Sequence, residues 1–185
     1  MSRLTGKNKA KKRSKSRVKS LNSYKLYQKK MLSKIRLFDD PILKEICDVV
    51  DIIKDKEDVI LISKQMKKVL GCSEDGVGLA ASQIGYRLKI IAVKENSDSY
   101  ATEIMINPEV ISNGEEEKEG YEGCLSYPGV TAKVLRYQEI TVKYINEEIK
   151  EVEKKFEGIK AVVVQHEIDH TVGICKVGEE YDKGE

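Results

Sequence analysis

The two histidines of the chain lie four residues apart, in the segment Gln165-His166-Glu167-Ile168-Asp169-His170. In a helix, residues i and i+4 lie on one face, so both imidazoles of this H-E-x-x-H pattern can bind one metal ion. Glu167, beside the first histidine, can exchange a proton with a water molecule that the metal activates. The pattern predicts a metal-dependent hydrolase, although a solvated helix with two incidental histidines would show the same letters.

A catalytic metal site has three protein ligands and one open position, so the third ligand must be Asp, Glu or Cys. One candidate is Cys124 in Glu122-Gly123-Cys124-Leu125-Ser126-Tyr127-Pro128-Gly129, where the glycines and the proline favour an exposed turn beside a strand. Most free cysteines are simply small buried hydrophobic residues. In the glutamate type of zinc peptidase the third ligand follows the helix, and the candidates are then Glu179, Glu180, Asp182 and Glu185.

A small-residue segment, Gly76-Val77-Gly78-Leu79-Ala80-Ala81, formally fits a dinucleotide fingerprint. That fingerprint needs a strand immediately before it, and residues 72–75 resemble a loop instead. We therefore interpret the segment as a loop in which Gly78 lets another backbone approach closely. Gln83 follows, and its side-chain amide could bind a developing oxyanion. The alternative for Gln83 is an ordinary surface glutamine.

The elements that must position these residues are two helices and several strands. Apolar residues at helical spacing predict a helix over residues 55–70, and residues 158–172 form a second helix with the histidines. Residues 115–119 are a solvated charge run, and Asn113-Gly114 and Asn146-Glu147 are turn signals. Buried strands are predicted over residues 87–94, 103–106 and 139–145. A strand-rich middle with a late helix favours the α+β class.

Charge divides the chain into two parts. The first 38 residues hold fourteen Lys or Arg and no acidic residue, whereas all 31 acidic residues come later. Residues 1–30 are too poor in apolar side chains to fold alone, so we expect a disordered basic extension before one catalytic domain at 31–185. The extension could bind RNA or ribosomes through residues 3–34, act as an organellar transit peptide, or be a passive tail preceding a start at Met31.

No signal peptide or membrane-spanning run is predicted, and the four cysteines show no C-x-x-C spacing. These features favour a cytoplasmic protein with free thiols, or an organellar one if the extension is a transit peptide.

Three segments together resemble the motifs of peptide deformylase, in the same order and at similar separations. The segments are Gly76-Val77-Gly78-Leu79-Ala80-Ala81-Ser82-Gln83, Glu122-Gly123-Cys124-Leu125-Ser126 and Gln165 to His170. The resemblance covers roughly residues 35–173, and Phe38-Asp39-Asp40-Pro41-Ile42-Leu43 is similar to the family's N-terminal segment. Ser82 stands where the family often has Pro or Thr. The short end after His170 resembles compact members without the long C-terminal helix.

The resemblance implies a peptide deformylase-like fold, with antiparallel and mixed sheets around a central H-E-x-x-H helix. It implies an enzyme that removes the formyl group from the N-terminal formyl-methionine of new proteins and releases formate. Cys124, His166 and His170 would hold the metal, Glu167 would transfer the proton, and the Gln83 amide and the Leu125 N–H would bind the oxyanion.

By the same resemblance, the peptide would lie extended against Gly78, with its methionine side chain in an apolar pocket. Val77, Val162 and Val163 are candidates for this pocket from their positions, and the alternative for each is a plain core residue. The metal would be Fe²⁺, with Zn²⁺, Ni²⁺ or Co²⁺ as substitutes. We expect a monomer that acts on N-formylmethionyl peptides away from membranes, with ribosome contact through the extension. Two other functions compete with this one: a general zinc endopeptidase with a downstream glutamate ligand, and an RNA- or ribosome-binding protein.

Overall fold

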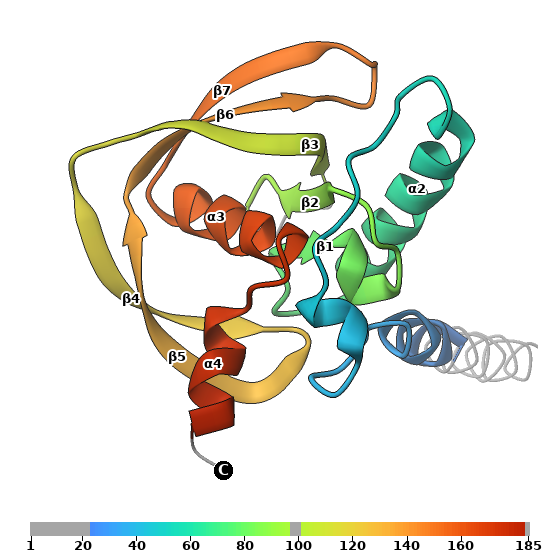
Figure 1. Ribbon diagram of the computed structural model, residues 1–185. Coiled ribbons are helices and arrows are strands. Elements are labelled where there is room, and N and C mark those ends of the chain that lie inside the picture. Colours follow the sequence, from blue (N-terminus) through green and yellow to red (C-terminus); the bar gives the residue numbers. More distant parts are fainter. Residues whose placement is uncertain (1–22, 97–100, 184–185) are drawn as a thin grey trace, which may run out of the picture.

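The computed structural model describes residues 23–96 and 101–183 (Figure 1), with the side chains of residues 180–183 left aside. Residues 1–22 of the expected disordered extension lie outside this range. The expectation differs from the structure over residues 23–30, which begin a helix over residues 23–32. This helix is anchored at its end, because Met31 is buried in a core cluster that also contains Ile62 and Met66. Leu32 and Ile35 pack against the same cluster.

Five antiparallel strands form the main sheet in the order β1-β2-β3-β6-β7. Their bounds are β1 Gly78–Ala80, β2 Ile90–Lys94, β3 Thr102–Asn113, β6 Glu139–Ile145 and β7 Glu151–Glu157. The three strands predicted from the sequence are present, although β3 is longer than predicted. The segment interpreted as a loop around Gly78 instead contains β1, which pairs with β2.

A separate two-stranded hairpin consists of β4 (Glu117–Cys124) and β5 (Tyr127–Tyr137). The predicted solvated charge run over residues 115–119 is confirmed, although its last three residues belong to β4, a strand that was not predicted. These residues are exposed, as predicted, but Glu117 and Glu119 pair across the hairpin with Tyr137 and Leu135.

Two α-helices match the sequence prediction: α2 (Lys56–Cys72) and α3 (Ile159–Thr171). A short helix that was not predicted, α4 (Lys176–Lys183), follows the histidines. Two 3₁₀ turns, η1 (Pro41–Lys44) and η2 (Ala81–Ile84), connect the elements. Among the described residues, no helix is long and apolar enough to cross a membrane.

Both faces of the main sheet are covered, because successive side chains of a strand point to opposite faces. In β2, Ile90 and Ala92 join the cluster under α2, whereas Ile91 and Val93 join the cluster under α3. A third cluster lies between the β4–β5 hairpin and α4. Helix α3 therefore lies in the middle of the molecule, in contact with the sheet and with β5 (Figure 1).

Candidate metal centre and substrate cavity

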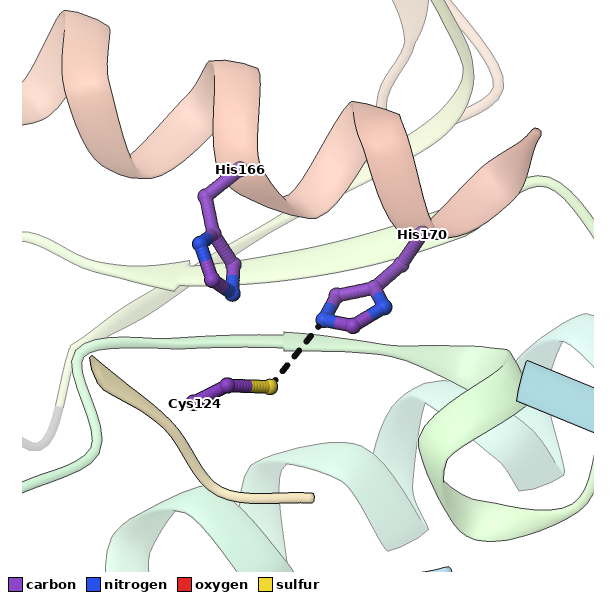
Figure 2. A group of neighbouring side chains, drawn as sticks. All are labelled: Cys124, His166 and His170. Atoms are coloured by element: carbon purple, nitrogen blue, oxygen red, sulfur yellow. Dashed lines mark hydrogen bonds between the residues drawn. The ribbon is translucent and has the colours of Figure 1, made fainter. Parts of the chain in front are cut away.

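Helix α3 and the end of β4 bring Cys124, His166 and His170 together (Figure 2). One ligand atom from each lies within 4.8 Å of the other two, and the Cys124 sulfur lies 3.3 Å from Nε2 of His170. Within the described part of the chain, this is the one group of three or more such side chains that could hold a metal ion. Glu179, a candidate for the alternative third ligand, lies outside it and is exposed.

The chemistry of these three side chains fits a divalent metal. Burial lowers the pKa of His170 to about 3, so this imidazole is neutral and can act as a ligand. Two effects raise the pKa of the Cys124 thiol above its usual range: the larger is a hydrogen bond with Cys175, and the smaller is burial. The thiolate form of Cys124 therefore requires a cation beside it, and a bound metal deprotonates a coordinating thiol.

A buried carboxylate orients His166. Nδ1 of His166 lies 2.9 Å from Oε2 of Glu122, which leaves Nε2 for a metal. Burial opposes charge on His166, but the bond to Glu122 and the nearby carboxylates together raise its pKa. Arg136 donates to both oxygens of Glu122, at 2.8 and 3.0 Å, and to Asp169 at 2.6 Å. Burial opposes ionisation of Glu122 too, yet the bonds from His166 and Arg136 lower its pKa to about 2.

Glu167 lies beside the metal group in a protected position. Burial raises the pKa of its carboxyl group to about 7, close to the optimum for a group that accepts and returns a proton at neutral pH. Its Oε2 has no hydrogen-bond partner among the described residues. A Cβ at Gly78 would overlap the Glu167 carboxyl group, so the glycine that we expected to admit a ligand backbone makes room for this side chain.

The 3₁₀ turn η2 fixes the amide of Gln83. Its Oε1 accepts a hydrogen bond from the N–H of Ala80 at 2.8 Å, so its NH₂ group points the other way. That group lies 3.4 Å from the Cys124 sulfur and donates to the Ser126 hydroxyl at 3.1 Å. Gln83 is 1% exposed, which excludes the surface-glutamine alternative.

A cavity of about 800 Å³ opens in front of these groups. Its wall includes all the predicted site residues except His170: Val77, Gly78, Gln83, Cys124, Leu125, Val162, Val163, His166 and Glu167. Strand β1 forms part of this wall and is an edge strand of the main sheet, so one of its edges has no neighbouring strand in the described structure.

Several residues of the site were not singled out from the sequence. Arg136 donates to Glu122 and to Asp169, and Ser126 accepts from Gln83. Asp169 and Ser126 lie inside the motifs and could have been examined for that reason. Arg136 lies in β5, opposite Lys118 of β4, and no local pattern marks it. Cys175 contacts Cys124 only because α4 folds back onto the hairpin.

The fold and the site define a metal-dependent hydrolase of the H-E-x-x-H type with a cysteine beside its two histidines. The family model described as polypeptide deformylase matches residues 32–179. The chain belongs to this family.

Relatives and structural neighbours of the chain carry the same family name. A peptide deformylase of Pseudothermotoga lettingae is 41% identical over 144 residues, which cover 78% of this chain and 80% of that protein. The Aquifex aeolicus peptide deformylase is 39% identical over 150 residues, covering 80% and 86%. A probable peptide deformylase of Synechococcus phage S-SSM7 superposes with a TM-score of 0.71 at 34% identity and covers 77% of this chain and 96% of that one.

The function follows from these matches. The chain is a metal-dependent peptide deformylase, which removes the N-formyl group from the N-terminal formyl-methionine of nascent proteins. Neither the general zinc endopeptidase nor the RNA-binding function is favoured. The predicted α+β peptide deformylase-like fold is confirmed.

Proposed function

We propose that Cys124, His166 and His170 bind the catalytic metal of this deformylase and that Glu167 is its proton-transfer group. The observation that carries the proposal is the N₂S group of ligand atoms within 4.8 Å of one another. Two of its residues, Cys124 and His166, lie on the wall of a cavity that Glu167 also lines. When bound there, the metal would polarise the formyl carbonyl and lower the pKa of water.

The side chains around this group have two further roles, proton transfer and stabilisation of the oxyanion. The Glu167 carboxylate takes a proton from the attacking water and delivers it to the departing amine, because its pKa lies near neutrality. As the carbonyl oxygen gains negative charge, the Gln83 NH₂ group and the Leu125 N–H donate hydrogen bonds to it. Loss of one such donor costs roughly 10²–10³-fold in rate.

The cavity wall supports an orientation for the substrate. The peptide lies extended along the open edge of β1, where it adds a strand to the sheet. The methionine side chain then enters the apolar part of the cavity beside Val77, Val162 and Val163. A structural neighbour from Acinetobacter baumannii, 30% identical with a TM-score of 0.71 over 77% of this chain, was crystallised with Met-Ala-Ser bound.

The roles of Glu167 and Cys124 can be tested by formate release from formyl-Met-Ala-Ser. Glu167→Ala should lose at least about 10²-fold in kcat while the metal content stays near that of the wild type. Cys124→Ala should lose metal as well as activity. An exposed residue of β7 away from the cavity, changed in Glu151→Gln, is the matched control and should retain both. Full activity of Cys124→Ala would contradict the proposed ligand group.

The cellular metal in this proposal is Fe²⁺, with Zn²⁺, Ni²⁺ and Co²⁺ as substitutes. A site with two imidazoles and one thiolate suits both iron and zinc, so ligand type alone does not separate them. Anaerobic purification followed by metal analysis is the test. Iron should dominate, and zinc-loaded protein should show lower kcat/KM; equal activity with zinc would contradict this assignment.

We also propose that the enzyme acts in the cytoplasm as a monomer and that its basic extension, residues 3–34, contacts the ribosome. Fourteen basic and no acidic residues in the first 38 support binding to phosphates. A protein that starts at Met31 should keep its activity on formyl-Met-Ala-Ser. Sedimentation with ribosomes should weaken strongly on this deletion and on raising salt. Unchanged sedimentation would contradict the ribosome contact.

A further inference from the structure

A second thiol lies beside the candidate metal ligand Cys124. After α3 the chain turns at Gly173, where φ is 76° and a Cβ would meet the Lys44 carbonyl, so only glycine fits. The N–H of Ile174 bonds to the Asp169 carbonyl at 3.0 Å and fixes the turn. Cys175 thereby returns to the hairpin, packs against the cluster that contains Cys124, and forms a hydrogen bond with its thiol.

The position of Cys175 also favours its reactivity. Cys175 begins α4: its carbonyl accepts the bond from Glu179 N–H at 3.0 Å, and the backbone N–H groups of Gly178 and Val177 donate to its sulfur. The sulfur of Cys175 therefore lies at the N-terminal end of α4, next to Cys124. Cys175 is also half-buried, so small oxidants can reach it, whereas Cys47 and Cys72 are buried.

Contacts on both sides hold this arrangement in place. Val177 is fully buried in the hairpin cluster, and a Cβ at Gly178 would overlap the ring of Tyr127. Helix α4 therefore has little freedom to withdraw Cys175 from Cys124. The neighbouring thiol lies outside the group of three ligand atoms, so it is free to react without being a ligand itself.

We propose that Cys124 and Cys175 form a disulfide when the protein meets a hydroperoxide, and that this bond removes Cys124 from the metal-binding group. In the first step the Cys175 sulfur attacks one peroxide oxygen, the O–O bond breaks, and a sulfenic acid and one molecule of water (from H₂O₂) form. In the second step the Cys124 sulfur attacks the sulfenic sulfur, the S–O bond breaks, and a second water leaves. The two sulfurs lose two electrons in total, and the peroxide gains them.

This reaction would protect the site as well as inactivate it. A thiol reduces the disulfide, whereas a cysteine without a partner proceeds to the irreversible sulfinic acid. Cys175 thus reacts with the peroxide first, and Cys124 resolves its sulfenic acid, so both sulfurs stay in a form that a thiol can reduce. The disulfide itself does not depend on the reaction catalysed, but its effect on activity rests on the proposed role of Cys124 as a ligand.

The test uses the full chain loaded with Ni²⁺, which avoids the reaction of ferrous iron with peroxide. The protein is treated with two equivalents of hydrogen peroxide, alkylated, and digested with trypsin without reduction. The two cysteines fall in separate tryptic peptides, Glu119–Lys133 and Ala161–Lys176, each with one cysteine. Mass spectrometry identifies the linked and oxidised peptides, and a chromogenic chelator measures Ni²⁺ release. Formate release is measured before and after dithiothreitol.

Two variants make the result specific. Cys175→Ser keeps a side chain that caps helices well, so α4 should remain folded. Cys72→Ser changes a buried cysteine of α2, away from the site, and is the matched control. Wild type and Cys72→Ser should give the linked peptide pair, release Ni²⁺, and regain most activity with dithiothreitol. Cys175→Ser should instead gain two oxygen atoms on Glu119–Lys133 and stay inactive.

Two results would overturn the inference. The first is wild-type protein in which Glu119–Lys133 carries the added oxygens while Cys175 remains free for alkylation. The second is reversible inactivation of Cys175→Ser to the same extent as the wild type. A linked pair with undiminished formate release would instead overturn the ligand role of Cys124, so the two failures are distinguishable.

Discussion

Oε2 of Glu122 lies 2.9 Å from Nδ1 of His166, and both side chains are buried. The carboxylate fixes the ring with Nδ1 as the donor, so Nε2 is left as the metal-binding nitrogen. Arg136 in turn holds both oxygens of this carboxylate. The orientation of one ligand therefore depends on a charge network that links β4, β5 and α3.

Replacing Glu122 with glutamine should weaken metal binding by about 10–100-fold. The amide cannot hold the imidazole as a carboxylate does, and Arg136 loses the charge of its main partner. Competition with a chromogenic chelator measures this affinity. Glu151→Gln is the matched control, since its ion pair with Lys143 is exposed and lies outside the cavity wall. Equal affinities of the two variants would show that the Glu122 contact does not support the ligand.

A methyl group at Gly78 should disable the site without unfolding the protein. The Cβ of Gly78→Ala would overlap the Glu167 carboxyl group and displace it. A displacement of about 1 Å in a catalytic group costs on the order of 10²-fold in rate, so kcat/KM for formyl-Met-Ala-Ser should fall at least that far.

Gly71→Ala is the control for this variant. Gly71 lies in α2, and a Cβ there meets nothing within 4 Å. Activity should be unchanged, and the free energy of unfolding should rise by up to about 1 kcal/mol, because alanine favours helix over glycine. If Gly78→Ala were as active as Gly71→Ala, the close packing of Gly78 and Glu167 would have no part in the reaction.

The sequence predicted the elements whose apolar residues are periodic. In α2, Val59, Ile62 and Met66 recur at helical spacing and are buried as that spacing requires. Strand β4 gave no such signal, because six of its eight residues are exposed and its stability comes from pairing with β5. The helix at residues 23–32 was missed for a related reason: only its last residues, from Met31, reach the core.

The residues of the site also fall into two groups, those that the sequence identified and those that it did not. Motif spacing identified the three ligand candidates, Gln83 and Glu167, because their chemistry constrains residue type. The supporting residue Arg136 and the second thiol Cys175 depend on how the hairpin and α4 pack against α3. Such contacts arise between segments far apart in the chain, and nothing in the local sequence of either segment announces them.

A larger side chain at Val162 should change the preference for the first residue of the substrate. Val162 lies on the cavity wall, one helical turn before His166. Val162→Phe would fill part of the space proposed for methionine, so kcat/KM for formyl-Met-Ala-Ser should fall by about tenfold or more. The loss should be smaller for formyl-Ala-Ala-Ser. Val172→Phe, at the exposed end of the same helix, should leave both values unchanged. Equal losses for both substrates would place the methionine elsewhere.

The stability of the metal-free protein should decrease from acid to mildly alkaline pH because of Glu167. Burial raises the pKa of this carboxyl group from 4.5 to about 7 in the folded state. Between these two values the folded protein binds more protons than the unfolded chain, so the free energy of unfolding falls as the pH rises. A shift of this size corresponds to about 3 kcal/mol, lost mainly between about pH 4.5 and pH 7.

Urea unfolding of the chelator-treated wild type and of Glu167→Gln, at about pH 4 and pH 8, measures this effect. The glutamine side chain stays neutral, so the variant should gain stability relative to the wild type on going from acid to alkaline pH. Other titrating groups are common to both proteins, and the comparison removes their contribution. A constant difference between the two proteins at both pH values would show that Glu167 is not neutralised by burial, and the basis for its proton transfer at neutral pH would then be lost.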